Sequence, residues 1–179
     1  MPRSSILQSA AARFPLLGRR PGRALVHGAV ALALLLTSLA ARPSPAAAEP
    51  APLPAQLWAG VNRLRAEAGL APLAETATLD AVAADRCADM VTRQYFSHTT
   101  PDGLDVFALL AERGIGFQTA GENLAWNTYG EDQAAAVALD GFLNSPPHRA
   151  NLLDPAFSQL GVGVVRDGGK LYFTLVFAG

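Results

Sequence analysis

Three ionisable residues beyond the midpoint of the chain have the side-chain types that a divalent metal or a small polar ligand needs. His98, Glu122 and His148 supply two imidazoles and one carboxylate. The chain has three histidines, and the third, His27, falls in an N-terminal segment that we expect to be removed. Both histidines of the remaining chain therefore belong to this set, and we predict that the three side chains converge in one cleft.

Two histidines and one glutamate with an open fourth position suit zinc or another divalent cation. In that case Glu122 would be either a ligand or a base that activates water. We expect the helix that starts at Pro146 to keep His148 neutral, which is the form that binds metal. The three residues are far apart in sequence, however, and the chain lacks a short metal motif such as HExxH. The alternative, which the sequence leaves open, is a buried hydrogen-bond network that locks loops together.

Other residues that could carry chemistry favour structural roles. No G-x-S-x-G motif is present, and Ser97 and Ser145 fit turn and cap positions better than nucleophile positions. The single cysteine, Cys87, lies on the apolar stripe of a predicted helix, which indicates a buried and unreactive thiol. We expect Arg149 and Asn151 to be surface or loop-fixing residues rather than catalytic ones.

The N-terminal segment has the layout of a secretory signal. Basic residues come first, an apolar run from Ala24 to Ala41 follows, and Ala46-Ala47-Ala48 supplies a small-residue cleavage site. Arg19-Arg20 leaves twin-arginine export open beside Sec export. We therefore predict a signal peptide over 1–48, a short lead-in over 49–54 and one domain over 55–179. The processed protein is expected to be secreted, periplasmic or extracellular, with no membrane span.

Removal of this segment would change the charge. Six of the 14 Lys and Arg residues precede residue 49, whereas all 15 Asp and Glu residues follow residue 48, so the remaining chain carries a formal charge of −7. That charge argues against nucleic acid as a partner and against an anionic membrane surface. The remaining length suits one domain with a core of its own, which we expect to be a monomer.

Apolar periodicity predicts the helices that must position these residues. Apolar residues at i, i+4 and i+7 indicate a helix over about 55–68, and a second stripe indicates one over about 79–94, capped by Thr78. Shorter helices are predicted over 106–113, 132–143 and 146–153.

The sequence also predicts one separate β-strand and a β-hairpin. A short strand is predicted over 117–126, and a hairpin is predicted from strands 161–166 and 170–178 around Asp167-Gly168-Gly169. Both faces of the last strand are mostly apolar, which indicates that it is covered on both sides. Helices on both faces of a small antiparallel sheet give an α+β fold, a three-layer α-β-α sandwich.

Several short segments occur in the order seen in bacterial CAP domains. They are Asn62-Arg63-Leu64-Arg65, Gly69-Leu70-Ala71-Pro72-Leu73, Tyr95-Phe96-Ser97-His98, Pro101-Asp102-Gly103, Gly121-Glu122-Asn123-Leu124, Ser145-Pro146-Pro147-His148-Arg149 and Gly161-Val162-Gly163-Val164. From Leu57 to Gly179 the chain thus resembles the CAP superfamily, also called SCP/TAPS. This superfamily joins cysteine-rich secretory proteins, insect antigen 5 and plant pathogenesis-related proteins.

The resemblance implies an α-β-α sandwich with a central cleft, lined by two histidines and acidic residues that sometimes hold zinc or another divalent ion. His98, Glu122 and His148 match those positions, whereas the second acidic residue of the eukaryotic set has no clear match here. Family functions vary from sterol and lipid binding to proposed proteolysis. We therefore expect a non-enzymatic domain that binds a small-molecule, lipid, peptide or cell-envelope ligand. The alternatives are a metal-assisted hydrolase that uses Glu122 and a structural cell-surface module.

Overall fold

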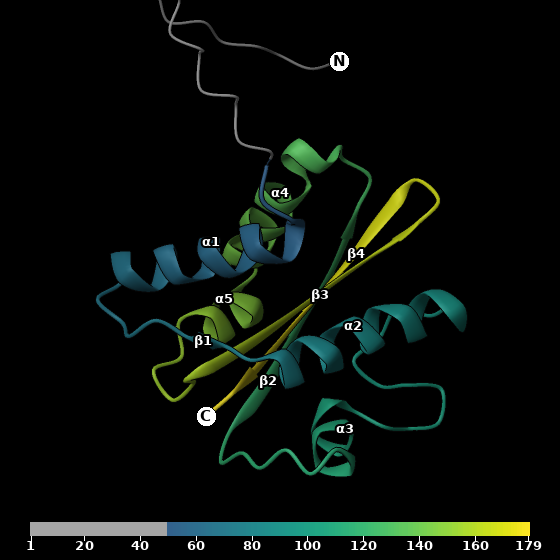
Figure 1. The fold of residues 1–179 in the computed structure, drawn as a ribbon, viewed down its shortest axis with the longest axis horizontal. Helices are drawn as coiled ribbons and strands as arrows, with labels where there is room; N and C mark the ends of the chain where they lie inside the picture. Colours follow the sequence, from purple (N-terminus) through teal and green to yellow (C-terminus); the bar gives the residue numbers. More distant parts are fainter. Residues whose placement is uncertain (1–49) are drawn as a thin grey trace, which may run out of the picture. The chain divides into compact units, whose positions relative to one another are not determined.

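The structure is a computed structural model that describes residues 50–179, and the predicted signal peptide lies outside these residues (Figure 1). The helices are α1 (Leu53–Glu67), α2 (Ala77–Thr92), α3 (Val106–Glu112), α4 (Glu131–Asn144) and α5 (Pro146–Leu152). The strands are β1 (Ala74–Glu75), β2 (Ala120–Asn127), β3 (Gln159–Asp167) and β4 (Lys170–Ala178). α1 thus begins inside the predicted lead-in, and the α+β class is confirmed.

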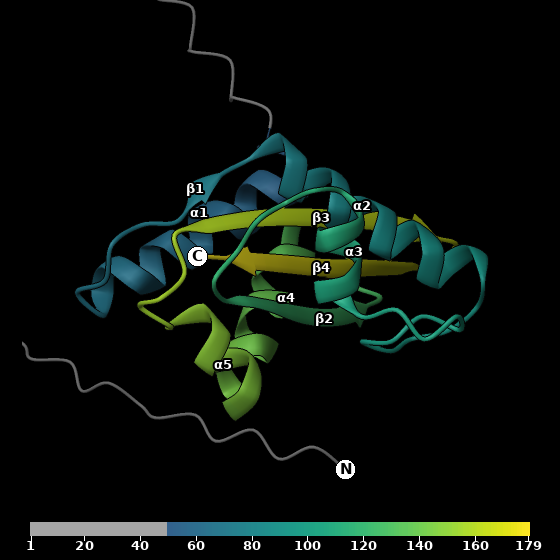
Figure 2. The same ribbon diagram turned by 90° about the horizontal axis from the view of Figure 1, so that it is seen from below.

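The strands form one sheet in the order β1-β3-β4-β2. Figure 2 shows the three long strands β3, β4 and β2 side by side in that order, and each neighbouring pair is antiparallel, as predicted. The two-residue strand β1 was not predicted, and it pairs with β3 in parallel, so the sheet is mixed. β1 lies there because Asn62 of α1 binds both the N–H and the C=O of Leu73, at 2.7 and 3.0 Å, and so anchors the connector that leads into it.

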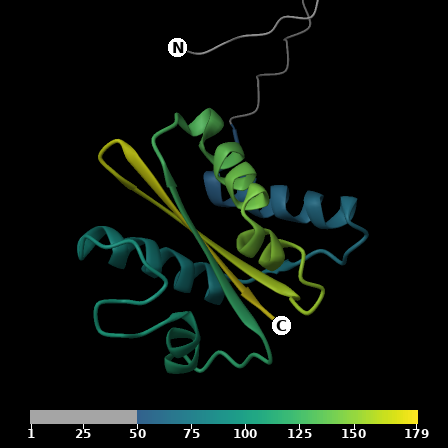
Figure 3. The same cartoon turned by 180° about the vertical axis from the view of Figure 1, so that it is seen from behind.

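The central strand β4 is covered on both faces, as its sequence predicts. One row of its side chains enters the larger core with residues of α1, α4 and α5; the row is Leu171, Phe173, Leu175 and Phe177. On the opposite face Val176 and Ala178 pack with residues of α2 and α3. These two cores on opposite sides of the sheet confirm the three-layer arrangement. Within the layer that contains α1, α5 follows directly on α4 (Figure 3).

Helix α2 lies unusually close to the sheet. A Cβ atom added at Gly161 or Gly163 of β3 would come within 2.2 Å of a backbone carbon of α2. Only glycine allows this approach. In addition, the Val162 N–H donates to Asp80 in the first turn of α2 at 2.9 Å, so the depth and the register of α2 on β3 are both fixed.

Some predicted helix ends differ from the structure. α2 begins earlier than predicted, and its N-cap is Thr76 rather than Thr78, without a side-chain cap hydrogen bond. Asp80 takes over the anchoring role through its bond to β3. Ser145 is the N-cap residue of α5 as predicted, but its hydroxyl makes no cap hydrogen bond either.

Candidate functional site

Glu122 lies on β2 with its side chain directed toward α2. It pairs in register with Val176 of β4, which belongs to the core under α2 and α3, and side chains of paired residues point to the same face. The Glu122 side chain is only 2 % exposed. A carboxylate this deeply buried is very costly unless it is paired.

The partner of Glu122 is Arg86, a residue of α2 that is itself 2 % exposed. Its Nε donates to Oε1 of Glu122 at 2.8 Å, and a terminal nitrogen is 3.5 Å from Oε2. Burial alone would lower the pKa of Arg86, but the hydrogen bond and the negative charge of Glu122 outweigh it and raise this pKa overall. The two residues therefore form a buried ion pair between α2 and β2.

Arg86 also holds the segment that follows α2. Its Nη1 donates to the Tyr95 hydroxyl at 2.7 Å, and its Nη2 donates to the Ser97 carbonyl at 2.8 Å. The Tyr95 hydroxyl in turn donates to Asp89. One guanidinium thus contacts both the buried carboxylate and the backbone of the residue before His98.

His98 completes the arrangement on the solvent side. Its Nδ1 is 2.8 Å from Oε2 of Glu122, while the His98 side chain is 58 % exposed. A carboxylate paired with an arginine can only accept a hydrogen bond, so we assign the proton of the neutral imidazole to Nδ1. Nε2 of His98 is then the ring atom left to meet a ligand.

A cavity of about 280 Å³ adjoins this pair, and we call it the His98–Glu122 cleft. Its lining includes His98 and Glu122, together with Asp105, Phe107 and Asn151. The mixture of an imidazole, carboxylates, an amide and an exposed aromatic ring suits a ligand with both polar and apolar groups.

His148 lies near this cavity but does not line it. Its ring is half-buried in the first turn of α5, with its edge against Phe142 at a centroid distance of 5.4 Å. Burial lowers the pKa of His148, and the nearby His98 lowers it further. The predicted neutral state agrees with this direction, whose causes are desolvation first and the second imidazole next. The structure brings His98 and Glu122 into direct contact, and within residues 50–179 His148 forms no side-chain hydrogen bond with either.

Two asparagines fix α5 against β2 next to the site. Asn151 donates to the Asn123 side chain at 2.8 Å and to the Glu122 carbonyl at 3.3 Å. Asn123 donates to the carbonyl of His148 at 3.0 Å. Asn151 thus fixes α5 to β2, and Asn123 holds the backbone of His148.

The donor set does not fit a preformed metal site. In the part of the chain that the structure describes, no group of three or more His, Cys, Asp or Glu side chains is placed to hold an ion. Both oxygens of Glu122 are already engaged, one by Arg86 and the other by His98. A zinc or other divalent ion at these residues therefore remains a prediction from the sequence, and the geometry around Glu122 speaks against it.

Arg86 is the site residue that the sequence analysis missed. It lies four residues after Val82 and four before Met90, both of which belong to the predicted apolar stripe of α2. A charged residue at such a position predicts a buried charge, and a buried charge needs a partner. Its position could have been noticed, but its partner, 36 residues away, could not have been read from the spacing.

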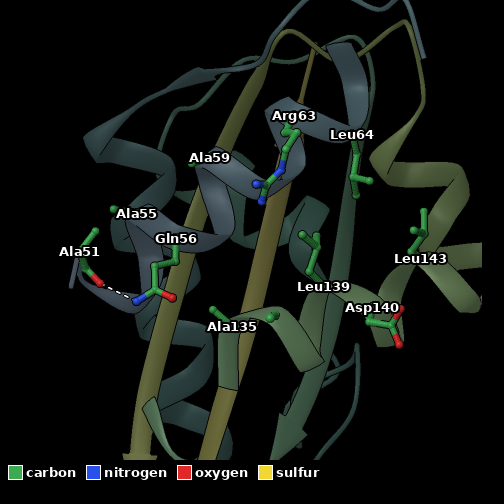
Figure 4. Close-up of a pocket in the computed structure, with 11 residues that line it drawn as sticks. Ala51, Ala55, Gln56, Ala59, Arg63, Leu64, Ala135, Leu139, Asp140 and Leu143 are labelled. Carbon is green, nitrogen blue, oxygen red and sulfur yellow. Dashed lines mark hydrogen bonds between the residues drawn. The ribbon is translucent and has the colours of Figure 1, made fainter. Parts of the chain in front are cut away.

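A larger groove lies elsewhere, between α1 and α4 (Figure 4). Its volume is about 500 Å³, and none of the three predicted site residues lines it. Most of the lining side chains are alanines and leucines, among them Ala55, Ala59, Ala135, Leu139 and Leu143. Arg63 and Asp140 are the charged residues of the lining.

One known protein family matches most of this chain. The sequence model of the family described as "CAP: Cysteine-rich secretory protein family" matches residues 58–177. The chain belongs to this family. The matched segment contains Arg86, His98 and Glu122 and ends one residue before the end of β4.

Individual relatives agree with this membership. The chain is 35% identical over 107 residues to the uncharacterized protein YkwD of Bacillus subtilis, a match that covers 60% of this chain and 40% of that protein. It is 40% identical over 105 residues to the uncharacterized membrane protein YlbC of Bacillus subtilis, covering 59% of this chain and 29% of that protein. The chain thus spans less than half the length of these relatives.

Solved structures show the same fold. An extracellular protein containing an SCP domain from Bacillus anthracis superposes with a TM-score of 0.63 at 34% identity, covering 70% of this chain and 40% of that one. An outer surface protein of Borrelia burgdorferi superposes with a TM-score of 0.61 at 20% identity, covering 68% of this chain and 88% of that one. Within residues 50–179, no helix combines the length and the apolar character that crossing a membrane requires.

Proposed function

We propose that this chain is an exported CAP-domain binding protein whose His98–Glu122 cleft takes a polar ligand. The observation that carries the proposal is the contrast in exposure between the paired side chains, 58 % for His98 and 2 % for Glu122. A network that only locks loops together explains the buried Arg86–Glu122 pair, since each of these charges needs the other. It does not explain why a buried carboxylate orients an imidazole that faces solvent.

The signal-like N-terminal sequence supports the exported location. The similarity to an extracellular SCP-domain protein of Bacillus anthracis points in the same direction. A protein in that location meets cell-envelope material first, so we propose a glycan or peptide of the envelope as the ligand of the cleft.

Co-sedimentation with purified peptidoglycan sacculi tests this proposal. Wild-type protein is expected to pellet with the sacculi, and His98→Ala to lose up to about tenfold in affinity, because a hydrogen bond to a neutral imidazole contributes about 0.5–1.5 kcal/mol. Glu67→Ala, a change at an exposed residue of α1, serves as the control and should bind like the wild type. Failure of the wild type to pellet, or equal binding by His98→Ala, would contradict the proposal.

The same experiment separates binding from hydrolysis. If soluble fragments appear over time, the protein is a hydrolase, and Nε2 of His98 is the atom placed to act as a base. Glu122 would then orient His98 rather than activate water itself, because both of its oxygens are already hydrogen-bonded.

The α1–α4 groove supports a lipid as a second ligand class. Its apolar lining and volume of about 500 Å³ suit an acyl chain, and Arg63 could pair with a carboxylate head group (Figure 4). Ala59→Phe should fill the groove and abolish binding of a fluorescent fatty acid, whereas His98→Ala should leave it unchanged. Equal fatty-acid binding by wild type and Ala59→Phe would rule the groove out as the lipid site.

A further inference from the structure

We infer that Arg86 is the positioning residue of the cleft: a buried counter-cation that holds Glu122 and His98 in orientation without a metal ion. The inference concerns the cleft of the proposed function, but it does not depend on what the cleft binds.

The geometry shows how one guanidinium can position His98 from two directions. Through Nε, Arg86 fixes Oε1 of Glu122 at 2.8 Å, and the other carboxylate oxygen then receives Nδ1 of His98 at 2.8 Å. Through Nη2, Arg86 holds the carbonyl of Ser97 at 2.8 Å, and Ser97 is the residue next to His98. The ring of His98 and the backbone that carries it are therefore tied to the same side chain.

Charge balance explains why a metal is not required. The buried carboxylate of Glu122 carries one negative charge, and Arg86 neutralises it inside the protein. A divalent cation bound to Glu122 would lie beside this guanidinium and would be repelled by it. If Glu122 instead turned away to reach the ion, Arg86 would remain buried with an unpaired charge, because only 2 % of its surface is exposed.

Zinc titration of the purified protein by calorimetry gives the first test. We expect no stoichiometric zinc binding that depends on Glu122, so wild type and Glu122→Gln should give the same heats. Binding of one zinc per wild-type protein, lost in Glu122→Gln, would overturn the inference.

The protonation pattern of the His98 ring gives a second test, which a merely structural role for Arg86 would not affect. In the wild type, ring-nitrogen NMR should show the neutral ring with its proton on Nδ1. In Arg86→Met the carboxylate of Glu122 loses the guanidinium that fixes its Oε1, and with it the orientation that receives Nδ1 of His98, so this signature should be lost. Arg86→Lys keeps the charge but not the planar fork, and it should retain the signature in part. An unchanged His98 signature in Arg86→Met would overturn the inference.

Thermal melts keep the inference testable if Arg86→Met folds poorly. Arg86→Met leaves Glu122 buried without its counter-charge, whereas Arg86→Met combined with Glu122→Gln removes both charges. The double variant should therefore melt at a higher temperature than Arg86→Met alone. If the melting temperature of the double variant falls by the sum of the decreases in Arg86→Met and Glu122→Gln, the two residues are not coupled, and the inference is overturned.

Discussion

Within residues 50–179 two arginines are fully buried, Arg65 and Arg86, and their charges are stabilised in different ways. Arg65 donates to the backbone carbonyls of Ala71, Leu152, Asp154 and Phe157, and burial lowers its pKa. Arg86 instead pairs with the carboxylate of Glu122, which raises its pKa. Arg65 is therefore a clamp between α1 and the segment after α5, whereas Arg86 is the cation that faces the candidate site.

Cys87, the neighbour of Arg86 on α2, is expected to be inert. Its side chain is fully buried with Sγ 3.1 Å from the Thr174 hydroxyl, and burial raises the pKa of the thiol to about 11. Because the thiolate is the reactive form, a thiol reagent should label the native protein slowly and the denatured protein fast. Equal labelling rates for native and denatured protein would show that this part of α2 opens readily.

His148 should make the stability of the protein depend on pH. Its pKa in the folded protein is lowered by burial and by His98, so the folded state binds a proton less readily than the unfolded chain. The free energy of unfolding should therefore be highest above the ordinary imidazole pKa of about 6.5, and it should fall as the pH drops from there to the folded pKa. Chemical denaturation at several pH values across this range should show that the unfolding free energy changes less with pH for His148→Gln than for the wild type. An identical pH dependence of the unfolding free energy in both proteins would mean that His148 is not desolvated in the fold.

At the scale of elements, the contact between α2 and β3 determines where the site lies. α2 carries Arg86, and its depth on the sheet decides whether that guanidinium reaches Glu122 on β2. The contact depends on Gly161 and Gly163, whose missing side chains let the helix backbone approach. Loss of this approach should therefore affect both the fold and the cleft.

Gly163→Ala tests the contact directly. The added methyl group would lie 2.2 Å from the carbonyl carbon of Ala83, so helix or strand must move, at a cost of about 1–3 kcal/mol or more in unfolding free energy. Gly169→Ala in the turn of the same hairpin is the matched control, because no atom lies within 4 Å of its added Cβ. Urea denaturation should show a large loss for the first variant and little change for the second. Equal effects would mean that α2 is not seated as described.

The elements differ in how far their sequences predict them. The stripe of α2 and the two apolar faces of β4 were predicted, because apolar spacing directly reports which face is buried. β1 was not predicted, because two residues show no periodicity. Its pairing also depends on a hydrogen bond from Asn62 of α1 to the Leu73 carbonyl. The contact of His98 with Glu122 could be expected from the motifs. The contact of Glu122 with Arg86 could not, because it too depends on a residue of another element.

At the scale of the whole molecule, residues 50–179 form one family domain with two separate hollows, and we propose each of them as a ligand site. The polar cavity at His98 and Glu122 opens beside β2, and the apolar groove lies between α1 and α4. Both are built from residues within the matched family segment or at its N-terminal edge. The chain spans less than half the length of the two Bacillus subtilis relatives.

The central claim is that buried Glu122 orients exposed His98 so that Nε2 meets the ligand. Ring-nitrogen NMR of the wild-type protein, recorded about two pH units above the imidazole pKa of about 6.5, tests it most directly. A free neutral histidine prefers its proton on Nε2, so the structure predicts the less common form, with the His98 proton on Nδ1 and bonded to the carboxylate. A His98 ring that carries its proton on Nε2, or that exchanges freely between the two forms, would contradict the account.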